Sequence, residues 1–209
     1  MFITEKLQAT HPGKITSTRY RAMNITLEDI IKDCKGGKHK AQKMLYEKFY
    51  RQMLGLCLRY CASKPEAEDV MLTGFMNIFT KIESYSGSGS FEGWMKKVMV
   101  NTAIDNFRKQ KKYNDHFDIS LFEEELMQEI DLPESLSINE ILDMVQKLPV
   151  GYRTVFNLYA IEGFNHQEIA EMLGVSVNTS KTQLFKARKL LQDSILKMNM
   201  EMKSRNQSE

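Results

Sequence analysis

The stretch from Asn165 to Leu191, NHQEIAEMLGVSVNTSKTQLFKARKLL, predicts a helix, a tight turn and a second helix. Its first half repeats apolar residues at helical spacing, as at Ile169 and Leu173. Gly174 suits the left-handed conformation that ends many helices, and Ser176 is a favourable N-cap for the helix that follows. This order is typical of a helix-turn-helix, whose second helix enters the major groove of DNA.

The second of these helices is predicted to have a narrow inward stripe and an outward face without acidic residues. The stripe consists of Ser180, Leu184, Ala187 and Leu191, and the outward face of Asn178, Lys181, Thr182, Phe185, Lys186 and Lys189. Amide and hydroxyl groups read base edges in the major groove, while lysines contact phosphates. Two interpretations stay open: a DNA-reading helix, or an ordinary helical hairpin with a solvated basic face. The motif also does not separate an activator, a repressor and a polymerase subunit.

Upstream of this motif, the sequence predicts further helices from Thr26 onward. Thr26 with Asp29 has the pattern of a capping box, and so does Ser63 with Glu66 at the start of a later helix. From residue 67 to residue 82, apolar residues follow the i, i+3, i+4, i+7 rule without a gap. This segment is the clearest periodic signal in the chain.

A Ser- and Gly-rich stretch from Ser84 to Ser90 predicts a flexible connection to the next helix. That helix begins near Phe91 and Trp94 and is expected to run to about residue 110. We expect Trp94 to pack in the core. The basic run RKQKK at 108–112 has two possible roles, since cations at a helix end complement the helix dipole and also bind nucleic acid.

An acidic segment separates the two groups of helices. Residues 113–146 hold ten acidic residues and no Lys or Arg, and Ser137 with Glu140 predicts the capped start of a new helical domain. No strand-like alternation is present, so we predict an all-α fold of two small helical domains joined by an acidic linker. The expected boundaries are an arm at 1–24, a domain at 25–112, the linker at 113–136, a domain at 137–197 and a tail at 198–209.

The overall charge conceals this segregation. The 209 residues carry 29 Lys and Arg against 27 Asp and Glu, a net charge of +2 that does not suggest a nucleic-acid partner. However, residues 93–112 hold six basic residues and one acid, and residues 179–192 hold four basic residues and no acid. The total is therefore an average over two basic segments and one acidic linker.

Several classes of protein are disfavoured by the composition. No apolar stretch approaches the roughly 20 residues that cross a bilayer, and the N-terminus lacks the apolar core of a secretion signal, so we expect a cytoplasmic chain without membrane insertion. Cys34, Cys57 and Cys61 fit a reducing compartment, and we expect core packing rather than zinc binding. No phosphate loop or zinc-protease motif is present, so we expect no enzyme activity, no metal and no cofactor.

Residues 25–191 together resemble an extracytoplasmic-function sigma factor of the sigma-70 family, the promoter-recognition subunit of bacterial RNA polymerase. The segment EAEDV at 66–70, followed by Phe75, resembles the region two helix that docks on the polymerase clamp. Phe91 with Trp94, then NTAIDNFRK at 101–109, is similar to the part that melts and reads the minus-ten element. Leu148-Pro149 with Arg153, IEGF at 161–164 and FKAR at 185–188 are similar to region four, which reads the minus-35 element.

The resemblance implies three sets of binding residues. The minus-35 set is Asn178, Thr179, Lys181, Thr182, Phe185, Lys186, Arg188 and Lys189; the minus-ten set is Lys97, Asn101, Asp105, Arg108 and Lys109; and the polymerase set is Glu68, Asp69, Val70, Thr73 and Phe75. It implies binding to core RNA polymerase at the clamp and flap regions, to promoter DNA and to an anti-sigma factor. It also places the acidic linker near the RNA path, whereas its charge alone predicts only an extended, solvated tether.

The chain departs from the family pattern at two places. Leu72, Thr73 and Gly74 stand where a Gln and an acid are usual, from which we expect a partly apolar docking surface. In region four, Asn178, Ser180-Lys181 and Gln183 replace the usual residues, and we expect these changes to alter which promoter is read.

The sequence leaves two alternatives to a sigma factor. One is a two-domain transcription regulator with a helical sensor domain and an operator-binding C-terminal domain. The segment from Asn101 to Lys112 argues against it, because a regulator has no reason to carry those residues in that register. The other is an enzyme, for which the four His residues offer no nucleophile or metal-site spacing.

Overall fold

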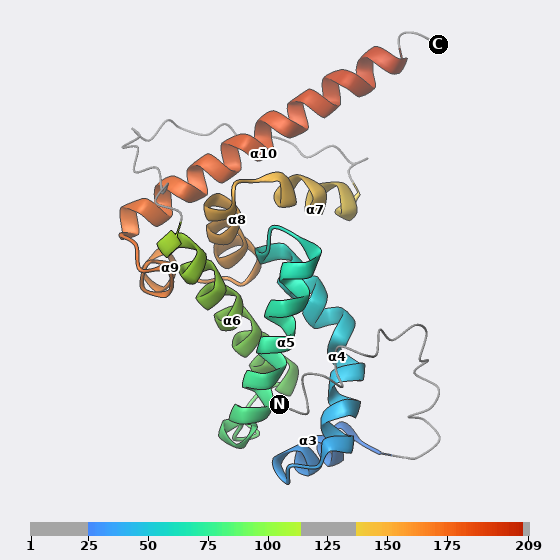
Figure 1. Cartoon of the computed structure of the whole chain (residues 1–209). Helices are drawn as coiled ribbons and strands as arrows, with labels where there is room; N and C mark the ends of the chain where they lie inside the picture. The colour runs from blue at the N-terminus through green and yellow to red at the C-terminus, as the bar shows by residue number, and fades with distance from the viewer. Residues whose placement is uncertain (1–24, 114–136, 207–209) are drawn as a thin grey trace. The chain divides into compact units, whose positions relative to one another are not determined.

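The computed structural model describes residues 25–113 and 137–206, and every regular element in these ranges is helical (Figure 1). The elements are α3 (Leu27–Lys35), α4 (His39–Tyr60), α5 (Lys64–Lys81), the 3-10 turn η1 (Ile82–Ser84), α6 (Phe91–Tyr113), α7 (Ile138–Lys147), α8 (Val150–Phe156), the π-helix η2 (Asn157–Ile161), α9 (His166–Leu173) and α10 (Val177–Asn206). The expected all-α fold is confirmed for the described residues. The expected arm at 1–24 and nearly all of the linker lie outside them.

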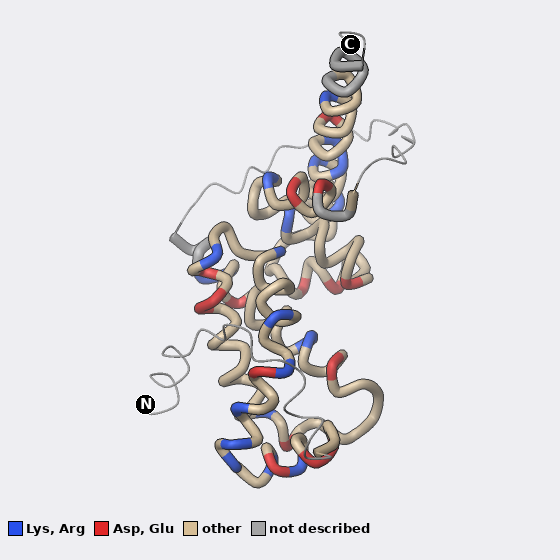
Figure 2. The backbone as a smooth tube through the Cα atoms, turned by 90° about the vertical axis from the view of Figure 1, so that its right-hand side faces the viewer, with Lys and Arg blue, Asp and Glu red and all other residues tan. Residues whose placement is uncertain are grey.

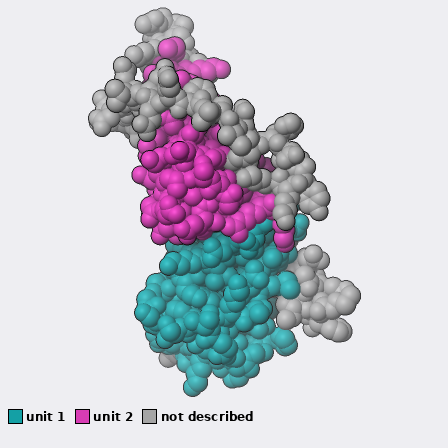
Figure 3. Space-filling view, turned by 90° about the vertical axis from the view of Figure 1, so that its left-hand side faces the viewer, with its two compact units in different colours: residues 1–58, 63–106 teal, residues 59–62, 107–209 magenta. Residues whose placement is uncertain are grey.

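The chain divides into two compact units, each described here by itself. An N-terminal unit comprises residues 1–58 and 63–106, and a C-terminal unit comprises residues 59–62 and 107–209 (Figure 3). The division falls within α6, a few residues before the boundary expected at 112. The short segment at the end of α4, residues 59–62, groups with the C-terminal unit.

Local side-chain contacts explain where the N-terminal helices begin. At α3, the Thr26 hydroxyl accepts a hydrogen bond from the Asp29 amide (3.1 Å), and the Asp29 carboxylate accepts one from the Thr26 amide (2.9 Å). These bonds lower the pKa of Asp29 below its ordinary value. At α5, the Ser63 hydroxyl caps the Glu66 amide, but the Glu66 carboxylate accepts from Asn106 instead of completing the box. The second predicted capping box is thus only half formed.

The core of the N-terminal unit lies between α4, α5 and α6. The ring of Tyr46 on α4 meets that of Phe75 on α5 with centroids 4.8 Å apart. Gly74 on α5 is buried against Met99 on α6, and a Cβ added there would lie 2.7 Å from the Met99 methyl carbon. The Met99 thioether therefore occupies the space that a side chain at residue 74 would take.

In the C-terminal unit, α10 packs against α8, α9 and α7. Capping boxes start α7, through Ser137 and Glu140, and α9, through Asn165 and Glu168, as their patterns predict. Backbone and side-chain hydrogen bonds from Ser137 lower the pKa of Glu140. Gly174 ends α9 in the left-handed conformation, at φ 62°, so the predicted turn is confirmed.

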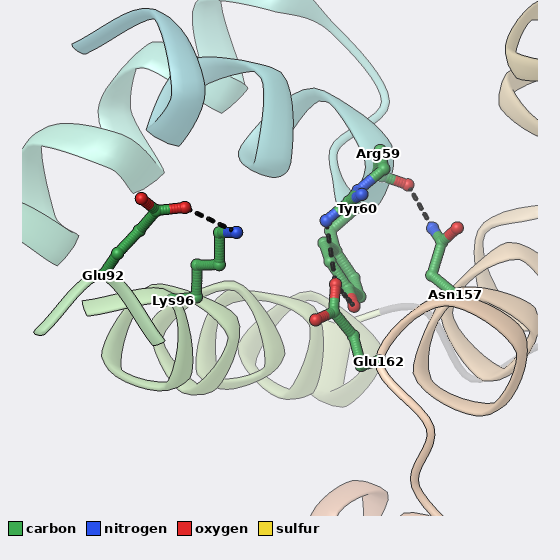
Figure 4. A network of polar contacts seen from close by, with 6 residues as sticks. All are labelled: Arg59, Tyr60, Glu92, Lys96, Asn157 and Glu162. Atoms are coloured by element: carbon green, nitrogen blue, oxygen red, sulfur yellow. Dashed lines mark hydrogen bonds and ion pairs between the residues drawn. The ribbon is translucent and has the colours of Figure 1, made fainter. Parts of the chain in front are cut away.

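Buried polar groups hold α8 and η2 inside the C-terminal unit. Arg153, only 3% exposed, donates from Nη1 to the Gln146 carbonyl (2.7 Å), and the fully buried Asn157 donates from Nδ2 to the Arg59 carbonyl (2.7 Å). Arg59 also pairs with Glu162 at 2.8 Å (Figure 4). Because buried polar groups are costly unless hydrogen-bonded, these contacts fix the position of the π-helix.

The last helix is longer than the sequence patterns predict. It runs from Val177 to Asn206, so the boundary expected at 197 falls within a continuous helix. Residues 198–206 of the expected tail therefore continue this helix. The apolar stripe of the recognition segment does not mark the end of the helix, because polar and methionine residues continue it with favourable helix propensity.

The three cysteines are buried and form no disulfide, as expected for core residues. Over residues 25–113 and 137–206, no helix is both long and apolar enough to cross a membrane. Within the same ranges, no group of three or more His, Cys, Asp or Glu side chains is placed to hold a metal ion.

Candidate nucleic-acid and polymerase interfaces

The N-terminal half of α10 presents the predicted minus-35 residues as one polar and basic face. Asn178, Lys181, Arg188 and Lys189 are exposed, and Thr179, Thr182, Phe185 and Lys186 are half-buried. Figure 2 shows Lys and Arg positions along this helix. Three members of the predicted inward stripe, Ser180, Leu184 and Ala187, are buried, and the fourth, Leu191, is half-buried. Phe185 contributes both to packing and to the surface.

Three members of this face are already engaged by neighbouring groups. The Thr179 amide donates to the Ser176 hydroxyl (2.9 Å), so Thr179 belongs to the cap of α10. The Lys186 ammonium lies 5.8 Å from the centre of the Tyr152 ring, and the Arg188 guanidinium lies 5.6 Å from that of Tyr159. These cation–π contacts direct both cations and limit their freedom.

Two positions expected to change promoter choice lie inside the unit. Ser180 is fully buried and Gln183 is only 4% exposed, so neither side chain can reach a base edge directly. The expected change in promoter choice stays a prediction, and any effect of Ser180 and Gln183 would pass through the packing of α10. Ser180 lies 3.0 Å, oxygen to nitrogen, from Nδ1 of His166 on α9, and the His166 ring stacks on Tyr159. Periodicity did not reveal His166, because its partner on α10 is fourteen residues away.

The predicted minus-ten residues follow one another along α6. Lys97, Asn101 and Asp105 are exposed and recur every fourth residue, which places them on one side of the helix. Lys109 is also exposed. Arg108 is exposed but belongs to the C-terminal unit, where its Nη2 donates to the Glu171 carbonyl (3.0 Å).

A neighbouring lysine on α6 is held by an acid. The Lys96 ammonium lies 2.9 Å from Glu92, whose carboxylate also accepts from Gln52 on α4 at 2.6 Å (Figure 4). The hydrogen bond from Lys96, followed by that from Gln52, lowers the pKa of Glu92. The carboxylate therefore stays ionised and holds Lys96 along α6.

An aromatic cluster stands where the Ser- and Gly-rich connection meets α6. Trp94 is half-buried and stacks on the buried Phe91 with centroids 5.6 Å apart. Tyr85, within the connection, contacts Phe91 and Trp94 at 5.0 and 5.7 Å. Trp94 thus packs against other aromatic rings, yet it is half-exposed, and its spacing of three and seven residues from Lys97 and Asn101 places it on the same side of α6. The role of Tyr85 was not predicted.

The predicted polymerase set divides between surface and core. On α5, Asp69 and Thr73 are exposed and Glu68 is half-buried. Val70 is 4% exposed and Phe75 is fully buried, so these two side chains belong to the core and cannot make the expected direct contact. They pack within the unit, and polymerase docking stays a prediction for Glu68, Asp69 and Thr73.

The structure explains part of the difference between residues 72–74 and the family pattern. Gly74 faces Met99 in the core and is absent from the surface, while Leu72 is half-exposed. Met76, 49% exposed, adds a second apolar group to the outer side of α5. Leu72 and Met76, rather than Gly74, therefore make the outer side of α5 partly apolar.

Comparisons with known proteins match both units. A model of sigma-70 region 2 matches residues 45–113, and a model of sigma-70 region 4 matches residues 138–191. The ECF RNA polymerase sigma-E factor of Haemophilus influenzae is 25% identical over 185 residues, covering 83% of this chain and 97% of the relative. The RNA polymerase sigma-H factor of Pseudomonas aeruginosa is 22% identical, covering 80% and 93%.

Solved structures are similar at lower identity. The sigma factor RpoE of Bartonella quintana, in complex with the anti-sigma factor NepR, is 20% identical with a TM-score of 0.44, covering 74% of this chain and 96% of that one. CnrH, in complex with the cytosolic domain of CnrY, is 18% identical with a TM-score of 0.41, covering 78% and 93%.

The two family matches together cover more than half of the chain, in the expected order and on the expected helices. The chain belongs to the sigma-70 family, as a sigma factor of the extracytoplasmic-function group. It therefore acts with core RNA polymerase to direct transcription from promoters, and the alternative of a ligand-sensing regulator is set aside.

Proposed function

We propose that the two units divide promoter recognition between them. The C-terminal unit reads the minus-35 element with the outer face of α10, and the N-terminal unit captures minus-ten bases along α6 as the duplex opens. The chain itself makes and breaks no covalent bond, and core polymerase synthesises the RNA. We also propose that the protein acts in the cytoplasm.

The observation that carries this proposal is the exposed row of Lys97, Asn101 and Asp105 beside the aromatic cluster of α6. A single strand is bound by cations that follow its backbone and by aromatic or amide groups that receive an unstacked base. Lys97 supplies the cation, Asn101 the amide, and Trp94 a partly exposed ring on the same side of the helix. An operator-binding regulator needs no such surface.

Polymerase docking is proposed for the outer side of α5. Asp69 and Thr73 supply exposed polar groups, and Met76 supplies an apolar one between polar neighbours. An apolar side chain surrounded by polar groups is a common form of interface anchor. The clamp as the partner of this surface, the flap as a second partner and an anti-sigma factor all follow from the family resemblance.

Run-off transcription tests the proposal directly. The purified chain and sigma-free core polymerase of the source organism are incubated with a library of that organism's promoters. We expect transcripts that start at defined positions and require the chain. Absence of promoter-dependent transcripts, together with tight binding of the chain alone to a duplex operator, would overturn the proposal.

A further inference from the structure

Helix α3 lies outside the matched sigma-70 region 2, which begins at residue 45, yet it contacts the connection that leads into α6. Ile30 and Cys34 anchor α3 in the core of the N-terminal unit, at 6% and 3% exposure. Helix α3 makes this contact with η1, the turn that leads into the Ser- and Gly-rich connection. An element beyond the family match therefore touches a segment beside the proposed minus-ten surface.

One side chain makes this contact specific. The ammonium of Lys35, the last residue of α3, donates to the Tyr85 carbonyl at 2.8 Å in a partly buried position. The same ammonium lies 5.9 Å from the centre of the Tyr85 ring. A hydrogen bond from a cation is stronger than one between neutral groups, and partial burial strengthens it further.

Tyr85 in turn contacts the rest of the connection and the start of α6. Its hydroxyl donates to the Gly89 carbonyl at 2.8 Å, which closes residues 85–89 into a small ring. Its aromatic ring contacts Phe91 and Trp94. Gly87 and Gly89, at φ 83° and 76°, supply the backbone freedom that this closure requires. Tyr85 thus restrains the connection, which was expected to be flexible, through its backbone carbonyl, its ring and its hydroxyl.

We propose that Lys35 is a positioning residue for minus-ten recognition: by holding Tyr85, it fixes residues 85–90 against Trp94, at the end of the surface that continues along α6 through Lys97 and Asn101, and so sets which unstacked base that surface accepts. This inference rests on the proposed function. Lys35 touches no base itself. A pre-organised loop loses less conformational entropy when the strand binds, so release of Lys35 weakens and broadens base selection.

A simpler role would be stabilisation of α3, because a cation in the last turn complements the helix dipole. Lys32 offers a matched control for that role. It lies in the same last turn, is exposed and carries the same charge. Lys32→Met therefore removes the dipole effect while leaving the Tyr85 contact intact.

The test uses holoenzyme made with Lys35→Met, Lys35→Arg, Lys32→Met or the unchanged chain, on templates whose minus-ten base pairs are randomised. Sequencing of the transcribed templates gives the preference for each base. We expect Lys35→Met to reduce the strongest preference by about tenfold, the scale of one charged hydrogen bond, while Lys35→Arg restores most of it and Lys32→Met changes little. Core binding by all four chains should be equal.

Two results would overturn the inference. One is an unchanged preference profile in Lys35→Met, and the other is an equal change in Lys32→Met. If Lys35→Met fails to fold, Tyr85→Phe tests the same loop, since it removes only the bond to Gly89, and an unchanged profile there counts against the inference. Absence of transcripts with the unchanged chain would instead refute the proposed function.

Discussion

Glu92 controls how many cations α6 offers to DNA. It lies 2.9 Å from Lys96 and keeps a lowered pKa because of that contact, so the ion pair persists at neutral pH. We predict that Glu92→Gln frees Lys96 and tightens binding of a single-stranded minus-ten oligonucleotide to the holoenzyme, by about two- to fivefold at low salt. The plot of log affinity against log salt should steepen by about 0.7, the value for one added phosphate contact on a single strand.

Glu83→Gln provides the control for this change. Glu83 is exposed on η1 in the same unit, and its substitution alters the net charge equally. An equal gain in affinity for both variants would show that net charge alone matters, and that the Glu92–Lys96 pair does not regulate the surface.

Gly74 on α5 leaves room for the Met99 side chain of α6. A Cβ at this position would press on the side chain of Met99, so we predict that Gly74→Ala lowers the free energy of unfolding by about 1–2 kcal/mol, an overpacking cost partly offset by better helix propensity. Gly55→Ala on α4 is the control, since its Cβ would meet nothing within 4 Å. That variant should gain about 0.5–1 kcal/mol. Urea unfolding of both variants checks the prediction, and equal shifts would contradict it.

Helices α9 and α10 are joined by a pH-sensitive contact. Burial lowers the pKa of His166 first, and the nearby cations Lys181 and Arg188 lower it further. Below about pH 6.5, the ordinary value for His, the unfolded chain therefore takes up a proton that the folded chain refuses. Stability of the C-terminal unit is thus predicted to fall as pH decreases from 7.5 to 5.5.

Scanning calorimetry of His166→Asn checks this effect. The variant should lose less stability between the two pH values than the unchanged chain, while His39→Asn, at an exposed position in the N-terminal unit, should behave like the unchanged chain. If His166→Asn keeps the full pH dependence, the contact is not its source.

The two halves of α10 should differ in their effect on promoter choice. Lys181 is exposed within the region 4 match, whereas Lys197 is exposed on the same helix beyond that match. Lys181→Ala is predicted to change the preferred minus-35 sequence, because a lysine on the reading face contacts base edges or adjacent phosphates. Lys197→Ala should leave the preference intact. Selection from randomised minus-35 templates measures both, and matching profiles for the two variants would remove Lys181 from the reading face.

At the scale of elements, apolar spacing and capping patterns predicted most helix starts, including α3, α7 and α9. These features are local, so the sequence carries them directly. The end of α10 and the π-helix were not predicted. The first lacks a breaker near residue 198, and the second depends on buried contacts of Arg153 and Asn157 with residues distant in sequence.

For the whole molecule, segregated charge predicted two basic regions, and exposed Lys and Arg side chains of α6 and α10 agree with that prediction. The acidic linker stays a prediction. Resemblance alone assigned Val70 and Phe75 to polymerase and Gln183 to promoter choice, although all three are buried. A family pattern mixes core and surface positions, because both kinds of residue are constrained. Contacts such as Lys35 with Tyr85 join residues fifty positions apart, and no spacing rule detects them.

The proposed function places α10 at the minus-35 element and α6 at the minus-ten element. Site-specific DNA cleavage tests which promoter element lies near each helix. An iron chelate is attached to a single introduced cysteine, either Lys181→Cys or Lys97→Cys. The native thiols interfere little, because all three are buried and burial raises the pKa of Cys34 to about 11.

Each labelled chain is assembled with core polymerase on a promoter that it transcribes, and the cleaved positions are mapped on both strands. The account predicts cleavage around the minus-35 element from residue 181 and around the minus-ten element from residue 97. Cleavage of the same element by both probes, or the reverse assignment, would contradict it.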